Sequence, residues 1–441
     1  MYGLCFFRNF AISNIMFVKV NRVVHSCLLR MVMATVMLLL WAGGVCSQNI
    51  GTTAESDATA EIAGKGDSVY VAPDSSNFVK ASILILEPMN KVYSVFGHSA
   101  FRMECPSAKL DYVFTFESDP GVSGFITFFA GKAKAAFVAV PTDRFLKDLR
   151  KERRGVKQYE LELTHHEKQE LWRYLDNDMM EGRHRKFNLL LNNCVSMTIL
   201  KIHQASIDER LVWAPWQGSM LLNNGDLVRH NARRSAWAEF LFVTFLGTGY
   251  DDYYDQELRL CPEILVDELR RASFVNNETG EKRPVMTDAG EELLPEYKSL
   301  REYTVTPTVL FGALLLLVCL LTLAEWTLKW QRAARWMDCI LFTLQSLLGL
   351  VLVYITFVSE IFGLLWNWYL IPINPLPLVL WLCFRKQKDF GKVYLLYTIV
   401  LVVFLVLTPF ISQLDVAHQL ITATMAVRCG SNYLSYRQNN R

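Results

Sequence analysis

Cys194 is the residue whose type and position most clearly suggest chemistry. It follows two asparagines and opens an amphipathic stretch, LLLNNCVSMTILKIHQ (residues 189–204). Apolar residues recur there at helical spacing and Asn193 is a good N-cap residue, so the pattern predicts that Cys194 lies in the first turn of a helix. The helix dipole and the unpaired N–H groups at that end lower the pKa of a thiol and favour the nucleophilic thiolate. A cysteine that only packs in the core fits the same local pattern.

A nucleophilic thiol needs a general base, and His98 is the leading candidate. His98 follows Gly97 at the start of a predicted strand, in the sequence SVFGHSAFRM, and a glycine in that position indicates a turn or a close backbone approach. His165 and His166 belong to the first turn of another predicted helix, and His203 lies too far along the helix of the cysteine to touch it.

The sequence predicts neither a metal nor an organic cofactor. His165, His166 and Glu167 come nearest to a metal motif, but the zinc-protease pattern needs a second histidine where Glu170 stands. Thr164 and Glu167 have the spacing of a capping box, which predicts that a helix begins here.

Short strands and helices interleave around these residues. Strands are predicted at 78–88, 99–103, 111–117, 134–141 and 157–164, and helices at 142–153 and 164–179. This pattern predicts an α+β domain that holds both the cysteine and the histidine.

The C-terminal third is apolar enough to form an all-α membrane domain. A spanning helix needs about 20 predominantly apolar residues, and about five such helices are predicted, at 307–326, 338–358, 361–384, 393–411 and 414–430. Lysine and arginine gather in alternate loops, which places those loops in the cytoplasm and the residues before the first span outside.

The remaining segments follow from this orientation. An apolar stretch between basic and small residues predicts a signal peptide in residues 1–47, followed by a linker at 48–77. Residues 78–275 form the exported, catalytic-like domain, 276–306 a second linker and 431–441 a cytoplasmic tail. The formal net charge of +2 gives no argument for a nucleic acid partner. We expect a protein of the bacterial inner membrane whose N-terminal domain lies in the periplasm.

Two predicted spans depart from plain apolar helices. The third contains Pro372, Pro375 and Pro377, and the fifth contains Asp415 and His418. These residues either line a path for a lipid or lie at the membrane interface.

The exported domain contains three cysteines, Cys105, Cys194 and Cys261. Export favours disulfides, and an odd number leaves at least one thiol free. One possibility is a Cys105–Cys261 disulfide with Cys194 free, and the other is three free thiols.

Several motifs in order, VFGHSAFRM, YVFTF, FFAGK, RRGVKQYELELT and FNLLLNNC, resemble the Lnb N-terminal periplasmic domain family. Members of that family carry a signal peptide, this domain and several C-terminal spans. The family pattern has aspartate where this chain has Asn192, whereas Asn193, Cys194 and His98 are kept. The order of histidine before cysteine is similar to that of the permuted papain-like thiol hydrolases and acyltransferases.

The resemblance implies an antiparallel sheet packed with helices, on which His98 meets Cys194. Such enzymes orient the imidazole with a polar side chain on the next strand, and Thr115 and Glu117 are the candidates, although the family often has asparagine in place of Thr115. The backbone N–H of Cys194 and the side chain of Asn193 are the expected oxyanion donors. Arg102, Arg153 and Arg154 are candidates for holding an anionic substrate group, or are solvated surface residues.

Together these features predict a membrane-anchored periplasmic thiol hydrolase or acyltransferase. We expect it to contact membrane lipids and to act on an ester or amide of an envelope lipid, a lipoprotein or a peptidoglycan peptide. The alternative is a catalytically silent envelope module that binds a partner or supports assembly, in which Cys194 is buried and inert and His98 lies far from it.

Overall fold

The computed structural model describes most of the chain after residue 78. The described residues are 79–89, 94–118, 127–128, 130–188, 192–215, 224–232, 235–247, 262–287, 289–296, 305–361, 367–378, 390–408 and 415–439. The predicted signal peptide and the linker that follows it lie outside these ranges.

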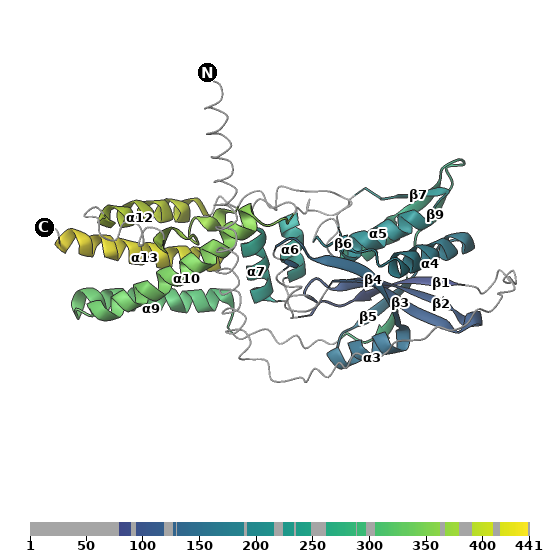
Figure 1. Cartoon of the computed structure of the whole chain (residues 1–441), viewed down its shortest axis with the longest axis horizontal. Helices are drawn as coiled ribbons and strands as arrows, with labels where there is room; N and C mark the ends of the chain where they lie inside the picture. The colour runs from purple at the N-terminus through teal and green to yellow at the C-terminus, as the bar shows by residue number, and fades with distance from the viewer. Residues whose placement is uncertain are drawn as a thin grey trace, which may run out of the picture. The chain divides into compact units, whose positions relative to one another are not determined.

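A seven-stranded antiparallel sheet forms the centre of the N-terminal domain, in the order β10-β5-β1-β2-β3-β4-β6 (Figure 1). Its strands are β1 Lys80–Leu86, β2 His98–Cys105, β3 Leu110–Ser118, β4 Lys134–Pro141, β5 Val156–Glu160, β6 Arg185–Lys186 and β10 Glu291–Leu294. The predicted α+β class with an antiparallel sheet is confirmed. β4 has the predicted bounds, whereas β5 ends four residues earlier than predicted, at Glu160.

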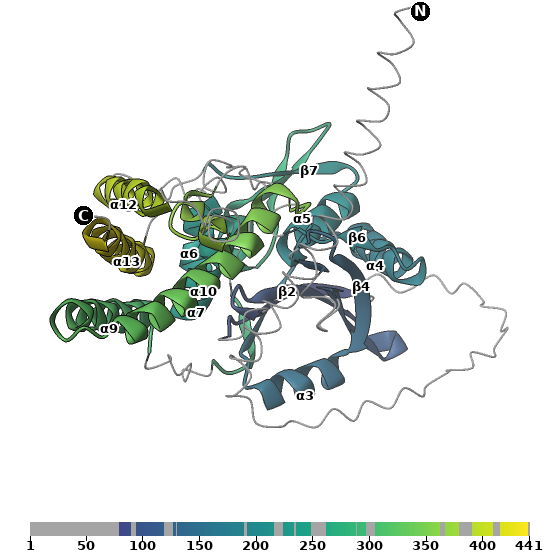
Figure 2. The same ribbon diagram turned by 60° about the vertical axis from the view of Figure 1, so that its left-hand side comes forward.

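Helices cover both faces of this sheet. α3 (Thr142–Glu152) lies on one face, where Leu149 packs with Leu84 and Val113. α4 (His165–Met180) and α5 (Cys194–Ala205) contact each other and lie on the opposite face, as Figures 1 and 2 both show. β1 reads KASILIL and is buried after its first residue, because it has strands on both sides and helices above and below.

The capping box predicted at the start of α4 is confirmed. The Thr164 hydroxyl accepts a hydrogen bond from the Glu167 backbone N–H, and the Glu167 carboxylate accepts one from the Thr164 N–H at 2.7 Å. His165 and His166 therefore occupy the first turn of a helix. Among the described residues, no three His, Cys, Asp or Glu side chains gather to hold a metal.

A second, three-stranded sheet corrects the predicted linker at 276–306. It consists of β7 (Glu209–Val212), β8 (Ser273–Asn276) and β9 (Lys282–Pro284), preceded by α8 (Pro262–Arg271). β9 and β10 both lie in the supposed linker. They are short and polar, so their sequences lack the alternation of a strand, and pairing with β8 and β5 gives them their conformation.

Within the described residues, the C-terminal region has four long helices: α9 Pro307–Thr327, α10 Gln331–Phe357, α12 Phe390–Leu407 and α13 Val416–Asn439. α9 and α10 are long and apolar enough to cross a membrane, and α12 contains a shorter apolar helix. α12 and α13 lie side by side (Figures 1 and 2).

Two predictions for this region need correction. The third span is not a continuous helix where it is described: residues 367–378 contain a short 3-10 helix, Trp368–Leu370 (η4), then turns, and a new helical stretch begins at residue 376. Proline removes backbone donors and disfavours a continuing helix, which explains the interruption. The predicted tail at 431–441 is helical as far as Asn439, because α13 continues beyond the apolar stretch.

Two short helices, α6 (Asn224–Ala232) and α7 (Ala236–Leu246), connect these parts of the chain. α7 reads AWAEFLFVTFL, and a helix that is apolar on all sides is buried on all sides. One of its faces packs against the N-terminal domain and the other against the C-terminal helices.

Candidate active site

The turn that leads into His98 requires a glycine. Gly97 has a φ of +76°, and a Cβ atom added there would lie 2.9 Å from the carbonyl oxygen of Leu86. Leu86 in turn pairs with His98 across β1 and β2. The expected turn and close backbone approach are both present. Together they fix the position of the backbone that leads into His98.

The imidazole of His98 is held by a chain of two further side chains. Its Nε2 atom lies 2.7 Å from Oγ1 of Thr115, whose hydroxyl donates to Oε1 of Glu117 at 3.2 Å. A hydroxyl has one hydrogen, so Oγ1 accepts from Nε2–H, and this network assigns the lone pair of the ring to Nδ1. Of the two candidates for the orienting group, Thr115 contacts the imidazole directly and Glu117 contacts it through Thr115.

Burial keeps the imidazole neutral. It lowers the pKa of His98 to about 3, and the positive charge of Arg154 contributes to this lowering. A neutral ring with its lone pair on Nδ1 can accept a proton, as a general base must.

Cys194 is the first residue of α5, as predicted. Asn193 is the N-cap: its side-chain oxygen accepts from the Ser196 N–H at 2.8 Å, while the Ser196 hydroxyl accepts from the Asn193 N–H at 2.9 Å. The side-chain oxygen of Asn193 is therefore committed to the helix cap. This arrangement places the thiol at the helix N-terminus, beside β2.

Ser99 joins the thiol to the strand that carries His98. The Cys194 thiol lies beside the backbone and side chain of Ser99 and beside the backbone of Val195, whose polar groups favour its thiolate form. Oγ of Ser99 also lies 3.2 Å from Oγ1 of Thr198, and Thr198 donates to the Cys194 carbonyl at 2.9 Å. The structure thus brings the thiol to the residue that follows the histidine.

The pKa of Cys194 differs from the expectation. Burial raises it, although the hydrogen bonds from Ser99 and Val195 and the charge of Arg154 oppose the rise. The helix N-terminus was expected to lower this pKa, but the half-buried position reverses the sign. The thiol is accordingly protonated at neutral pH.

Arg154 lies at the site, and its side chain is buried. Its Nε–H donates to the carbonyl oxygen of Glu87 at 2.8 Å, and Glu87 follows the residue that pairs with His98. Its charge lowers the pKa of both His98 and Cys194, although burial has the larger effect on each. The neighbouring Arg153 caps the end of α3 and is exposed.

Arg102 is not part of this site. Its side chain donates to both carboxylate oxygens of Asp111 at 2.9 and 2.7 Å and to Gln158 at 2.8 Å, and it lies 3.1 Å from Glu104. It also stands four residues further along β2 than His98, about 13 Å at the usual rise of a strand. Arg102 joins neighbouring strands of the sheet, so the prediction that it holds substrate is not supported by its position.

The Cys105–Cys261 disulfide is not formed. Cys105 is a free thiol at the end of β2, where its sulfur lies 3.4 Å from the Ser107 hydroxyl. Cys261 itself is outside the described residues.

Sequence reasoning missed Ser99 and Thr198. Their only sequence signal was position, one residue after His98 and one helical turn after Cys194. Their roles follow from the docking of α5 on β2, which no local pattern encodes.

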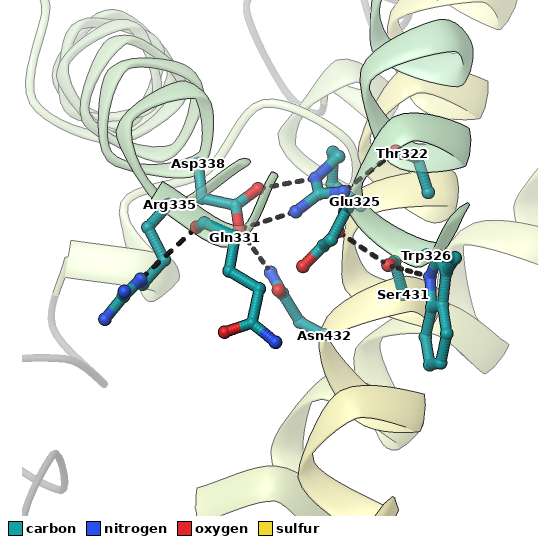
Figure 3. Close-up of polar contacts among 9 residues, drawn as sticks. Thr322, Glu325, Trp326, Gln331, Arg335, Asp338, Ser431 and Asn432 are labelled. Atoms are coloured by element: carbon teal, nitrogen blue, oxygen red, sulfur yellow. Dashed lines mark hydrogen bonds and ion pairs between the residues drawn. The ribbon is translucent and has the colours of Figure 1, made fainter. Parts of the chain in front are cut away.

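A second polar cluster lies among the C-terminal helices (Figure 3). The fully buried Arg428 of α13 binds Asp338 of α10 through two nitrogens, at 2.6 and 2.8 Å. A third nitrogen binds Glu325 of α9 at 2.9 Å and Thr322 at 2.8 Å. Asn432 donates to Asp338, and Ser431 to Glu325 (Figure 3). The cluster ties α9, α10 and α13 together.

The fold and the site together define a class: an exported α+β domain in which a histidine begins the central strand of the sheet and a cysteine begins a helix that contacts this strand, continuous with an apolar helical region. Residues 72–222 match the Lnb N-terminal periplasmic domain, and residues 298–439 match the Lnb transmembrane domain. The chain therefore belongs to the Lnb family, and is a membrane-anchored envelope protein with a periplasmic N-terminal domain. No curated protein and no solved structure matches it significantly.

Proposed function

We propose that this protein is a periplasmic thiol hydrolase or acyltransferase, held in the bacterial inner membrane by several spanning helices. Its substrate is an ester or amide of the cell envelope: an acyl lipid, a lipoprotein or a peptidoglycan peptide. The observation that carries the proposal is the junction of β2 and α5, where the Cys194 thiol lies beside Ser99, the residue after His98, and Ser99 lies 3.2 Å from Thr198 of α5. The chain from His98 through Thr115 to Glu117 supports it.

The first half of the proposed reaction acylates the enzyme. Nδ1 of His98 takes the thiol proton of Cys194 as the sulfur attacks the carbonyl carbon, and the carbonyl π electrons move to its oxygen. Backbone N–H groups in the first turn of α5 stabilise the oxyanion. The intermediate then collapses, and the imidazolium gives its proton to the departing alcohol or amine, leaving a thioester on Cys194.

The second half releases the acyl group. Water or an acceptor hydroxyl or amine gives a proton to His98 as it attacks the thioester, and the thiolate leaves and takes that proton. Because burial raises the pKa of Cys194 and lowers that of His98, both groups are neutral at rest. Proton transfer therefore accompanies attack instead of preceding it.

The test is to trap the acyl-enzyme. We would incubate the full chain in detergent with a labelled phospholipid, a diacylated lipopeptide or a muropeptide, and search for a hydroxylamine-sensitive adduct on the Cys194 peptide. We expect an adduct with one of them, and none in Cys194→Ser or His98→Gln. Cys105→Ser, which removes a buried thiol at the far end of β2, is the matched control and should keep the adduct.

A silent binding module is the second candidate, and the raised pKa of Cys194 favours it. It predicts no adduct with any of the three probes. It also predicts that alkylation of Cys194 by iodoacetamide proceeds at the same rate in the wild type and in His98→Gln. That pair of results would replace the enzymatic proposal.

A further inference from the structure

α7 is packed on two opposite faces by different parts of the chain. On one face Ala238, Phe242 and Leu246 join a core cluster that contains Val95 and Val228. On the other, Phe240 and Val243 join a cluster of residues from the C-terminal region; its other members are Leu352, Tyr369, Ile373, Phe404, Ala417 and Ile421. A helix buried in this way has little freedom to shift without moving its neighbours.

The first face touches both segments that lead into the candidate active site. Phe242 meets Phe96 edge to face, with ring centroids 4.7 Å apart, and Phe96 directly precedes the Gly97–His98 turn. Phe187 packs against the same cluster, and its backbone N–H donates to the Ala133 carbonyl at 2.7 Å. Phe187 opens the segment that ends at Cys194. One cluster therefore supports the approach to both reactive residues.

The second face of α7 is held by His418 of α13. The imidazole is stacked between Phe240 and Tyr369, with centroid distances of 4.7 and 3.7 Å. Its Nε2 lies 2.8 Å from Oγ1 of Thr244 on α7, and its Nδ1 lies 2.5 Å from Asp415. Because His418 is almost fully buried, its ring joins two elements instead of facing an open path.

A second, weaker connection joins the C-terminal region to the segment before Phe187. Glu360, just after α10, lies 2.7 Å from Nζ of Lys186 and 3.5 Å from Nζ of Lys132. Its backbone N–H donates to the Ala130 carbonyl at 3.1 Å. These side chains are about half exposed, and exposed ion pairs contribute about 0–1 kcal/mol. The packed faces of α7 are therefore the stronger link.

We propose that α7 is the element through which the C-terminal helices set the geometry of the Cys194–His98 site, with Phe242 and Thr244 as positioning residues. Thr244 fixes the helix to His418, and Phe242 transmits its position to the His98 turn through Phe96. The C-terminal region then does more than anchor the domain. This inference rests on the proposed function, because it concerns the same cysteine and histidine.

The test uses the full chain in detergent and iodoacetamide as the probe of Cys194. Alkylation is followed on the Cys194 peptide by mass spectrometry, and the measured quantity is the ratio of the rate near neutral pH to the rate at alkaline pH. Base-assisted reaction contributes most near neutral pH, and a change in exposure cancels in the ratio. A purely structural weakening of the fold would leave this ratio unchanged.

Thr244→Val and His418→Phe each break the bond between α7 and α13 while keeping a similar volume. We expect both to lower the ratio by about fivefold, the effect of a bond worth about 1 kcal/mol. Thr424→Val is the matched control, because Thr424 is a buried hydroxyl on α13 that donates to the Leu420 carbonyl, within its own helix. It should leave the ratio unchanged.

A double substitution tests transmission along α7. If Phe242 and His418 act through one helix, the fold-changes of Phe242→Leu and His418→Phe will not multiply in the double variant. If the ratio is unchanged in Thr244→Val and His418→Phe but still falls in His98→Gln, the role of α7 is overturned and the proposed function stands. An unchanged ratio in His98→Gln would overturn the proposed function itself, so the two failures are distinguishable.

Discussion

Nε2 of His98 lies 2.7 Å from Oγ1 of Thr115, and the Thr115 hydroxyl donates its own hydrogen bond to Oε1 of Glu117. Thr115 pairs with Ala100 across β2 and β3, two residues from the histidine, and is fully buried. A strand register thus determines which imidazole nitrogen is left to receive a proton. The proposed role of His98 as a base depends on this bond, because in the other tautomer Nδ1 would carry the hydrogen and could not accept a proton.

Thr115→Val removes this bond at nearly constant volume. We expect it to lower the neutral-pH alkylation rate of Cys194 and any acyl transfer by about tenfold, within the range for general-base catalysis. Thr115→Asn, which can still accept from Nε2–H, should retain most of the rate. Thr142→Val is the control, since it removes a hydroxyl bound to Asp111, away from the histidine. Equal rates in Thr115→Val and wild type would contradict the assigned tautomer.

Gly97→Ala adds only one methyl group, but we expect it to disturb the candidate active site strongly. The new Cβ would meet the Leu86 carbonyl oxygen, and the positive φ adds strain of about 1–3 kcal/mol. Gly182→Ala is a close control, because Gly182 has a φ of +55° but nothing within 4 Å of its added Cβ. We expect both variants to melt earlier, measured by tryptophan fluorescence, and only Gly97→Ala to slow alkylation of Cys194. A normal alkylation rate in Gly97→Ala would argue that the turn does not set the position of His98.

Protonation of His98 should make the domain less stable in acid. Its pKa falls from 6.5 to about 3 on folding, so between these values the unfolded chain binds a proton that the folded chain does not. Stability therefore falls as the pH drops below 6.5, by about 1.4 kcal/mol for each pH unit at most, and is unaffected above it. The His98→Gln variant has no imidazole to protonate at this position, so its unfolding temperature should decline less steeply as the pH falls below 6.5. His166→Gln changes an exposed histidine and should follow the wild type.

The predictions from sequence were accurate where the signal is local. The start of α4 follows from Thr164 and Glu167, and the start of α5 from Asn193, because a cap is a pattern of adjacent residues. The apolar run KAAFVAVP likewise located β4. Cys194 and His98 stand out as candidates through local signals of the same kind, an N-cap in one case and a preceding glycine in the other.

The rest depends on contacts between distant segments. No local feature places Ser99 on the thiol or commits Arg102 to Asp111 and Gln158, since both require strands and helices to be docked first. The sign of the Cys194 pKa shift was wrong for the same reason: the helix end is visible in the sequence, whereas the burial that outweighs it is not.

In the buried cluster around Arg428, we expect substitution of Asp338 and of Glu325 to destabilise the protein unequally. Asp338 binds two nitrogens of the guanidinium, whereas Glu325 binds one and lies on the opposite side of a group with a single positive charge. Two carboxylates share that charge, so removing one of them lessens their mutual repulsion. Asp338→Asn breaks the two-nitrogen contact and should destabilise the C-terminal helices by about 3–5 kcal/mol, as breaking a buried pair does.

Glu325→Gln keeps a hydrogen-bond acceptor for Arg428 and relieves the repulsion, so we expect it to cost far less. The measurement is thermal unfolding of the full chain in detergent, compared with Thr322→Val, which removes only the neutral partner of Arg428. Arg428→Met, which leaves both carboxylates in an apolar bundle, should be at least as harmful as Asp338→Asn. If Glu325→Gln proved the more damaging of the two carboxylate variants, Glu325 and not Asp338 would be the main counter-ion of Arg428.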